Sequence, residues 1–191
     1  PTHQPVETLA SLRAIPNLNV FRPADPVEVA ECWALALASH FAPSVIALTR
    51  QGVPTLRKEH MEINLCESGG YIISKSDLKP SVTIISSGSE VAIAVNVQQR
   101  LAEDNIGVNV VSMPSWEIFD NQGVDYQRSI LGSGLRVGLE AAVEQGWHKY
   151  LGESGIFIGM KGFGSSAPAE QLYDHFNINV QSIIEAIKSN M

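Results

Sequence analysis

The residues Leu18-Asn-Val-Phe21-Arg-Pro-Ala-Asp25-Pro26-Val-Glu28 decide the fold of the first part of this 191-residue chain. Leu18–Phe21 is short and largely apolar, which predicts a strand. Asp25 stands directly before Pro26, with Glu28 three residues after the aspartate. A carboxylate can accept hydrogen bonds from the free N–H groups of a first helical turn, and proline fits that turn. The stretch therefore predicts a strand followed by a capped helix.

The expected helix carries apolar residues at helical spacing, which predicts a face that lies on a sheet. These residues are Val27, Ala30, Ala34, Leu37, Ala38 and Phe41, with Trp33 alongside. Pro43 and Ser44 end the helix, and Val45–Thr49 is a continuous apolar run typical of a strand covered on both faces. Strand, helix and strand over this length predict a right-handed βαβ unit.

Two residues near this unit are candidates for binding a small polar or anionic molecule. The opening Pro1-Thr-His-Gln-Pro-Val-Glu7 predicts a helix capped by Thr2, so that His3 would sit at the helix mouth, beside exposed N–H groups. Arg50 follows the second strand, and ligands of open α/β sheets collect at the carboxyl ends of strands. Its guanidinium suits phosphate or carboxylate. A surface histidine, and an arginine in a salt bridge or a solvated loop, remain the alternatives.

Composition limits the class of protein. With 45% hydrophobic and 17% charged residues the chain is expected to be globular. A net charge of -7 argues against nucleic acid as a partner, and no apolar run suits a membrane span or a secretory signal. The two cysteines, Cys32 and Cys66, form no disulfide framework or metal motif, so reduced thiols and a cytoplasmic location are expected.

Residues 53–68 are polar and turn-rich and are interpreted as a linker, and residues 69–191 as an α/β domain. Its predicted strands are Tyr71–Ser74, Ser81–Ser86, Val108–Ser112, Leu135–Leu139 and Ile156–Gly159. Predicted helices begin at a Ser87-Gly-Ser-Glu90 capping box, at Tyr126, near Ser166 with Pro168 in the first turn, and at Asn179. Met113–Gln122 is expected to be an irregular loop.

Other stretches admit a chemical and a structural interpretation. The turn Ser86–Glu90 could hold phosphate, but a capping box explains it. Gly162–Pro168 could cradle an anion, and a tight turn explains it equally well. Trp147–Tyr150 is expected to be packing with an ordinary surface histidine. No metal motif is present, so the predicted metal ligands are none.

Read as a string, the chain resembles transketolases over essentially its whole length. The matching segments are Pro1-Thr-His-Gln-Pro-Val-Glu7, Phe21-Arg-Pro-Ala-Asp25, Ala47-Leu-Thr-Arg-Gln51, Gly69-Gly-Tyr71, Ser87-Gly-Ser-Glu90, Val110-Val-Ser-Met-Pro114 and Phe163-Gly-Ser-Ser-Ala-Pro168. The resemblance implies that residues 1–52 are the latter part of a doubly wound pyrimidine-binding domain. It also implies that residues 69–191 are the C-terminal α/β domain, with a mostly parallel, mixed sheet and flanking helices.

The resemblance also implies a chemistry. Transketolases are homodimers that use thiamine diphosphate and Mg²⁺ or Ca²⁺ to move a two-carbon ketol unit from a ketose phosphate to an aldose phosphate, in the pentose phosphate pathway. His3 matches the histidine of the family's P-T-H-Q-P motif, which contacts substrate oxygens and is the catalytic candidate here. Arg50 matches the arginine that binds the sugar phosphate.

The family's diphosphate-binding and metal-binding residues have no counterpart in these 191 residues, so no cofactor-binding residue is assigned. The chain alone is expected to be an inactive fragment that binds no cofactor, which calorimetric titration with thiamine diphosphate and magnesium would test. Two alternatives stay open. One is a related thiamine-dependent enzyme of the dihydroxyacetone synthase type, and the other is a non-catalytic α/β interaction module.

Overall fold

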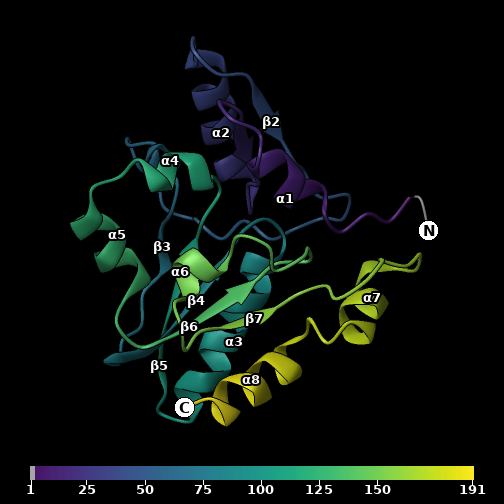
Figure 1. Ribbon diagram of the computed structural model, residues 1–191. Helices are drawn as coiled ribbons and strands as arrows, with labels where there is room; N and C mark the ends of the chain where they lie inside the picture. The colour runs from purple at the N-terminus through teal and green to yellow at the C-terminus, as the bar shows by residue number, and fades with distance from the viewer. Residues whose placement is uncertain (1–2) are drawn as a thin grey trace.

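Two sheets organise the protein in this computed structural model, which describes residues 3–191 (Figure 1). A small parallel sheet pairs β1 (Asn19–Phe21) with β2 (Ser44–Ile46), placing Val20 opposite Val45. The helix α2 (Pro26–Ala38) connects these two strands. The predicted βαβ unit is therefore confirmed, with a second strand shorter than the apolar run suggested.

The predicted start of α2 is also confirmed. The side chain of Asp25 accepts a hydrogen bond from the backbone N–H of Glu28 at 2.9 Å. The Glu28 carboxylate in turn accepts one from the N–H of Ala24 at 2.7 Å. The first bond satisfies an N–H group that a helix start otherwise leaves unpaired, and the second ties the residue before the cap to the first helical turn.

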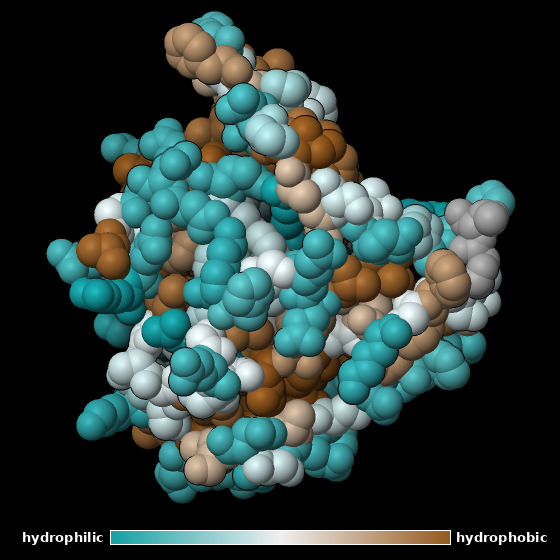
Figure 2. All heavy atoms as spheres, in the orientation of Figure 1, coloured by the Kyte–Doolittle hydropathy of each residue, from teal (hydrophilic) through white to brown (hydrophobic). Residues whose placement is uncertain are grey.

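The prediction that the apolar face of α2 lies on a sheet is wrong. The residues that α2 buries are Glu28 and Cys32, whereas Trp33, Leu37 and Phe41 are 50%, 75% and 98% exposed. The buried side faces the 3-10 helix η1 (Leu65–Ser68) and its neighbours. A two-stranded sheet is too narrow to cover the opposite side of a long helix, so the apolar residues there meet solvent. Figure 2 shows apolar side chains among polar ones at the top of the view, where α2 and β2 lie.

The first helix, α1 (Thr8–Arg13), begins later than predicted. Glu7 occupies its cap position, without a side-chain hydrogen bond, and Thr2 lies outside the described residues. Gln4 precedes a proline, which disfavours helical backbone at that residue. The carbonyl oxygens of Gln4 and Val6 accept N–H groups from residues 164 and 143, so this segment bonds to distant parts of the chain.

The larger sheet has five strands in the order β3-β5-β4-β6-β7, and only β3 runs antiparallel to its neighbour. The mostly parallel, mixed α/β sheet is thus confirmed. The strands are β3 (Tyr71–Ser74), β4 (Pro80–Ser86), β5 (Gly107–Ser112), β6 (Leu135–Leu139) and β7 (Ile156–Ile158). Their bounds agree closely with the predicted strands because each is an apolar run bounded by turn residues.

Alternating side chains of this sheet build two cores, one on each face. Ile84 and Val110 face the core under α3 (Glu90–Glu103) and α8 (Val180–Ser189), which pack side by side. Ile85 and Val111 face an aromatic core. That core also takes residues from α4 (Trp116–Asp120), α5 (Val124–Leu131) and α6 (His148–Leu151). The seventh helix, α7 (Ala169–His175), lies near the opening segment (Figure 1).

Two details of this region differ from the predictions. Met113–Gln122 is not all loop, because α4 forms within it and buries Trp116 and Phe119 against the sheet. The helix α7 begins at Ala169 after Pro168 and receives no cap from Ser166. By contrast Asn179 caps α8, accepting the N–H of Ser182 at 2.9 Å, as predicted.

Candidate functional site

The structure brings His3 and Arg50 to one cavity of about 460 Å³. Both side chains are exposed, and His3 lies in a turn rather than at the mouth of a helix, because α1 starts only at Thr8. The cavity is lined by His3, Gln4, Arg50, Gln51, Ser165, Ser166, Ala167, Ala169 and Leu172. We refer to this space as the His3–Arg50 cavity. Its walls therefore come from the opening segment, from the chain after β2, and from the region of α7.

Arg50 follows β2, whose carboxyl end lies beside that of β1: the N–H of Ala47 donates to the carbonyl of Phe21 at 2.8 Å. No salt bridge joins Arg50 to any residue between 3 and 191. The salt-bridge alternative for this residue is thus not what the structure shows. An exposed guanidinium at the edge of a cavity can still bind an anionic group.

The segment 162–168 closes one side of the cavity. The side-chain amide of Gln4 donates to Ser166 Oγ at 2.6 Å, and the N–H of Gly164 donates to the Gln4 carbonyl at 3.1 Å. A Cβ on Gly164 would approach the Gln4 Cβ to 3.0 Å, so glycine permits this close pairing. The glycine-rich stretch therefore forms part of the cavity wall, which the turn interpretation alone did not anticipate.

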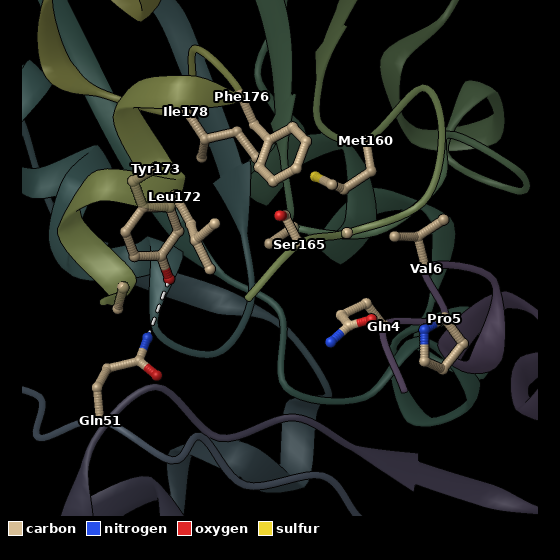
Figure 3. A pocket seen from close by; sticks show the side chains of 13 residues that line it. Gln4, Pro5, Val6, Gln51, Met160, Ser165, Leu172, Tyr173, Phe176 and Ile178 are labelled. Atoms are coloured by element: carbon tan, nitrogen blue, oxygen red, sulfur yellow. Dashed lines mark hydrogen bonds between the residues drawn. The ribbon is translucent and has the colours of Figure 1, made fainter. Parts of the chain in front are cut away.

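Gln51, which also lines the cavity, is held by a residue of α7. Its side-chain amide donates to the hydroxyl of Tyr173 at 3.1 Å (Figure 3). That hydroxyl in turn donates to the Glu90 carboxylate at 2.7 Å. Both burial and the neighbouring Glu90 raise the pKa of Tyr173, so the hydroxyl keeps its proton at neutral pH.

A second, smaller cavity of about 240 Å³ adjoins the first and shares Gln4, Gln51, Ser165, Ala169 and Leu172 with it. Its remaining wall is largely apolar, as Figure 3 shows for Val6, Met160, Phe176 and Ile178. The polar groups of the region thus gather toward His3 and Arg50, and the apolar groups lie beneath α7.

A cluster of buried charges lies behind these cavities, at the carboxyl ends of β4 and β6. Arg22 pairs with Glu90 at 2.5 Å, and Arg13 binds both oxygens of Glu140 at 2.8 and 2.9 Å. Ser87 donates to Glu140 at 2.5 Å. The predicted capping box is therefore wrong, since Ser87 and Glu90 bind residues distant in sequence and the start of α3 has no side-chain cap.

The same cluster excludes the turn at Ser86–Glu90 as a phosphate site. Gly88 has a φ of +61°, and a Cβ there would lie 2.7 Å from Arg22 Cζ, so the guanidinium already fills the space over the turn. Two carboxylates surround it, which would repel an anion. The guanidinium of Arg22 occupies the place where open α/β sheets commonly bind ligands.

The aromatic stretch at Trp147–Tyr150 is confirmed as packing. Trp147 is fully buried and donates its indole N–H to Glu140 at 3.0 Å. Tyr150 is buried against Trp116 and donates its hydroxyl to Asp120 at 2.9 Å. These side chains contribute to the second core and lie away from the His3–Arg50 cavity.

Among residues 3–191, no group of three or more His, Cys, Asp or Glu side chains is placed to hold a metal ion. The cavity offers one imidazole and one guanidinium, which suit a single phosphate and do not suit a diphosphate with its metal. No helix within the described part of the chain is long and apolar enough to cross a membrane.

The roles of Gln4, Ser166 and Tyr173 around the cavity were missed by the sequence predictions. For Ser166 a signal existed, since Gly162–Pro168 was a possible anion cradle. For Tyr173 none existed, because its hydroxyl meets Gln51 only after the chain has folded.

Comparison with known proteins identifies two family models that match this chain. Residues 69–179 match the transketolase-like C-terminal domain, and residues 1–55 match the transketolase pyrimidine-binding domain. A transketolase of Sinorhizobium medicae is 50% identical over 96% of this chain and 27% of its own length.

Solved structures give the same result. A transketolase from Leishmania mexicana has a TM-score of 0.88 and 40% identity, over 97% of this chain and 27% of its own. A Pichia stipitis transketolase solved in complex with sedoheptulose-7-phosphate has a TM-score of 0.90 and 34% identity, over 100% of this chain and 27% of its own. The chain thus spans about a quarter of the length of each of these relatives.

Proposed function

The chain belongs to the transketolase family, and we propose that it supplies the sugar-phosphate-binding part of a transketolase. Such an enzyme transfers a two-carbon ketol unit from a ketose phosphate to an aldose phosphate. The observation that carries the proposal is the meeting of His3 and Arg50 at one cavity. The Pichia relative, solved with a sugar phosphate, supports the choice of ligand.

Arg50 is proposed to bind the phosphate of the sugar. Its side chain is exposed at the cavity and has no salt bridge within residues 3–191, so binding a phosphate would break no ion pair. A guanidinium can donate two parallel hydrogen bonds to phosphate oxygens, which fixes both the position and the orientation of the group.

His3 is proposed to contact substrate oxygens nearer the reacting carbons. An imidazole can donate a hydrogen bond to a hydroxyl or carbonyl oxygen, or accept one from a hydroxyl. Because His3 and Arg50 line the same cavity, one extended sugar phosphate can reach both. The two residues would then hold the substrate at both ends of its chain.

Family membership implies thiamine diphosphate, which stabilises the carbanion that forms when the ketol unit is transferred. The described residues do not suit that group, because they include no cluster of His, Cys, Asp or Glu that could hold its metal ion. Mg²⁺ or Ca²⁺, a homodimer and a place in the pentose phosphate pathway belong to the same proposal. Buried, unpaired Cys32 and Cys66 agree with a reducing compartment and support a cytoplasmic location.

The division into domains is also part of the proposal. Residues 1–52 would be the latter part of the pyrimidine-binding domain, residues 53–68 a linker and residues 69–191 the C-terminal domain. The two matched family models support it, and residues 52–64 contain no helix or strand. Arg57 nevertheless pairs with Glu31 at 2.7 Å, so the linker is anchored to α2.

The test replaces Arg50 in the full-length enzyme. Arg50→Ala should raise the KM for phosphorylated sugars, because a charged contact is lost, and this rise should correspond to a loss of ~2–4 kcal/mol in binding free energy. The KM for unphosphorylated sugars should change much less. Arg50→Lys, which keeps the charge without the paired donors, should fall between. Equal effects on both kinds of sugar would contradict the phosphate role and would favour a scaffold or interaction role for this region.

A further inference from the structure

We infer that residues 164–173, which lead into α7 and form most of it, position both proposed substrate-binding side chains. Tyr173 acts through Gln51 on Arg50, and Ser166 acts through Gln4 on His3. This inference rests on the proposed function of His3 and Arg50. It assigns to Tyr173 and Ser166 the part of positioning residues, which fix the geometry of neighbours that touch the substrate.

The anchor at Arg50 is a chain of hydrogen bonds that ends in the buried charge cluster. Gln51 is the next residue after Arg50, and its amide donates to Tyr173 at 3.1 Å. Tyr173 donates to Glu90 at 2.7 Å, and Glu90 pairs with Arg22 at 2.5 Å. Glu90 is fully buried, so this chain ends on a group that has little freedom to move.

The anchor at His3 is shorter and nearer the surface. Gln4 follows His3 directly, and it is held twice by the segment 162–168: through its side chain by Ser166 at 2.6 Å and through its carbonyl by Gly164 at 3.1 Å. A side-chain bond and a main-chain bond to one residue fix both its position and its orientation. The backbone that carries His3 is thus tied down on the side of the cavity.

Both anchors belong to one continuous piece of chain, residues 164–173. That piece therefore sets the distance between the two backbone segments from which His3 and Arg50 project. A substrate that bridges an exposed histidine and an exposed arginine must otherwise lose affinity to order them, since long side chains and loops lose conformational entropy on binding. Holding the adjacent residues in advance reduces that cost.

The decisive experiment is a double-mutant cycle in the full-length enzyme, with KM and kcat measured on phosphorylated and unphosphorylated sugars. Tyr173→Phe and Gln51→Met each remove one partner of the bond and keep the side-chain size. Each should raise KM for the phosphorylated sugar about three- to tenfold, the effect of one hydrogen bond, with kcat unchanged. The double variant should be no worse than either single variant, because the two side chains act as one unit.

Tyr150→Phe is the matched control. Tyr150 also donates its hydroxyl to a carboxylate, that of Asp120 at 2.9 Å, but it does not line the cavity. The Tyr150→Phe variant also loses a hydrogen bond from a tyrosine hydroxyl to a carboxylate. Its KM therefore shows how much a general loss of stability, away from the cavity, changes KM. Combined with Gln51→Met it should show no coupling.

The second anchor is tested in the same way. Ser166→Ala should raise KM for the phosphorylated sugar about threefold, Ser166→Thr should restore it, and Ser166→Ala should be fully coupled to Gln4→Met. Ser165→Ala should show no coupling to Gln4→Met, since Ser165 lines the cavity and makes no hydrogen bond to Gln4 within the described residues.

The outcomes separate this inference from the function on which it rests. If Arg50→Ala changes KM only for phosphorylated sugars while Tyr173→Phe and Ser166→Ala leave it unchanged, the positioning role is wrong and the phosphate role stands. The positioning role would also be overturned if the KM effects of the two single variants simply added up in both double-mutant cycles. The same holds if Tyr173→Phe changed KM no more than Tyr150→Phe does. If Arg50→Ala has no selective effect, the proposed function itself fails.

Discussion

Glu140 shows how a fully buried charge is kept in this fold. Its carboxylate accepts hydrogen bonds from Arg13, Ser87 and Trp147. Burial alone would raise its pKa, but Arg13 first and then Arg22 outweigh burial and lower the pKa from 4.5 to about 2. The stabilisation by this carboxylate is therefore complete above pH 4.5 and is lost as the pH falls toward 2.

Replacing Glu140 tests this directly. Glu140→Gln leaves Arg13 buried without its partner charge and should lower the free energy of unfolding at pH 7 by ~3–5 kcal/mol. The difference between wild type and variant should shrink as the pH is lowered from 4.5, which urea unfolding at several pH values measures. Exposed Glu144 provides the control, and Glu144→Gln should change stability by less than about 0.5 kcal/mol. A loss at Glu140 no larger than at Glu144 would contradict the account.

At the site, the sequence indicated which side chains were candidates for binding a ligand, but not that they line the same cavity. Arg50 was a candidate because it follows a strand, as the structure bears out, whereas the helix mouth expected at His3 does not form. The roles assigned to both residues came from the family resemblance. Their meeting at one cavity depends on segment 162–168 and on Tyr173, which are distant in sequence. Single-sequence patterns carry no information on such contacts, and Ser87 and Glu90 were misread for the same reason.

At the scale of elements, Asp25 joins α2 to the segment that follows β2. One carboxylate oxygen accepts the N–H of Glu28, and the other accepts the N–H groups of Leu56 and Arg57 at 2.9 and 3.2 Å. Asp25 is buried, so removing it leaves three backbone N–H groups without partners in a place that water does not readily reach.

Asp25→Ala should therefore lower the free energy of unfolding by ~2–4 kcal/mol, more than an exposed helix cap contributes. Asp25→Asn keeps one acceptor oxygen and should lose about half as much. Urea unfolding of the two variants measures the difference, with Asp77→Ala at an exposed position as control. Equal stability of Asp25→Ala and Asp77→Ala would show that the bonds to Leu56 and Arg57 contribute nothing.

The elements themselves differ in how far sequence predicted them. The strands of the large sheet could be predicted because short apolar runs between turn residues are typical of strands. The helix α4 was missed because Trp116 and Phe119 give it two buried positions, too few for a periodic pattern. The apolar face of α2 was misassigned because periodicity identifies a face but not what covers it.

At the scale of the whole molecule, charges join the first part of the chain to the second. Arg13 lies in α1 and Arg22 directly follows β1, whereas their partners are Glu90, the first residue of α3, and Glu140, which directly follows β6. The side chains of these pairs are almost fully buried, and the pairs tie the part of the chain before β2 to the part that contains the large sheet. The sequence predicted both parts and gave no sign of the buried pairs that hold them together.

We propose that His3 and Arg50 bind one sugar phosphate in a cavity whose wall includes residues 165–172. A crystal structure of the full-length enzyme with sedoheptulose-7-phosphate tests it most directly. We expect phosphate oxygens at ~2.7–2.9 Å from the Arg50 guanidinium, the sugar within hydrogen-bond reach of His3, and the Gln51–Tyr173 and Gln4–Ser166 bonds intact. A phosphate bound elsewhere, with Arg50 turned to solvent, would contradict it.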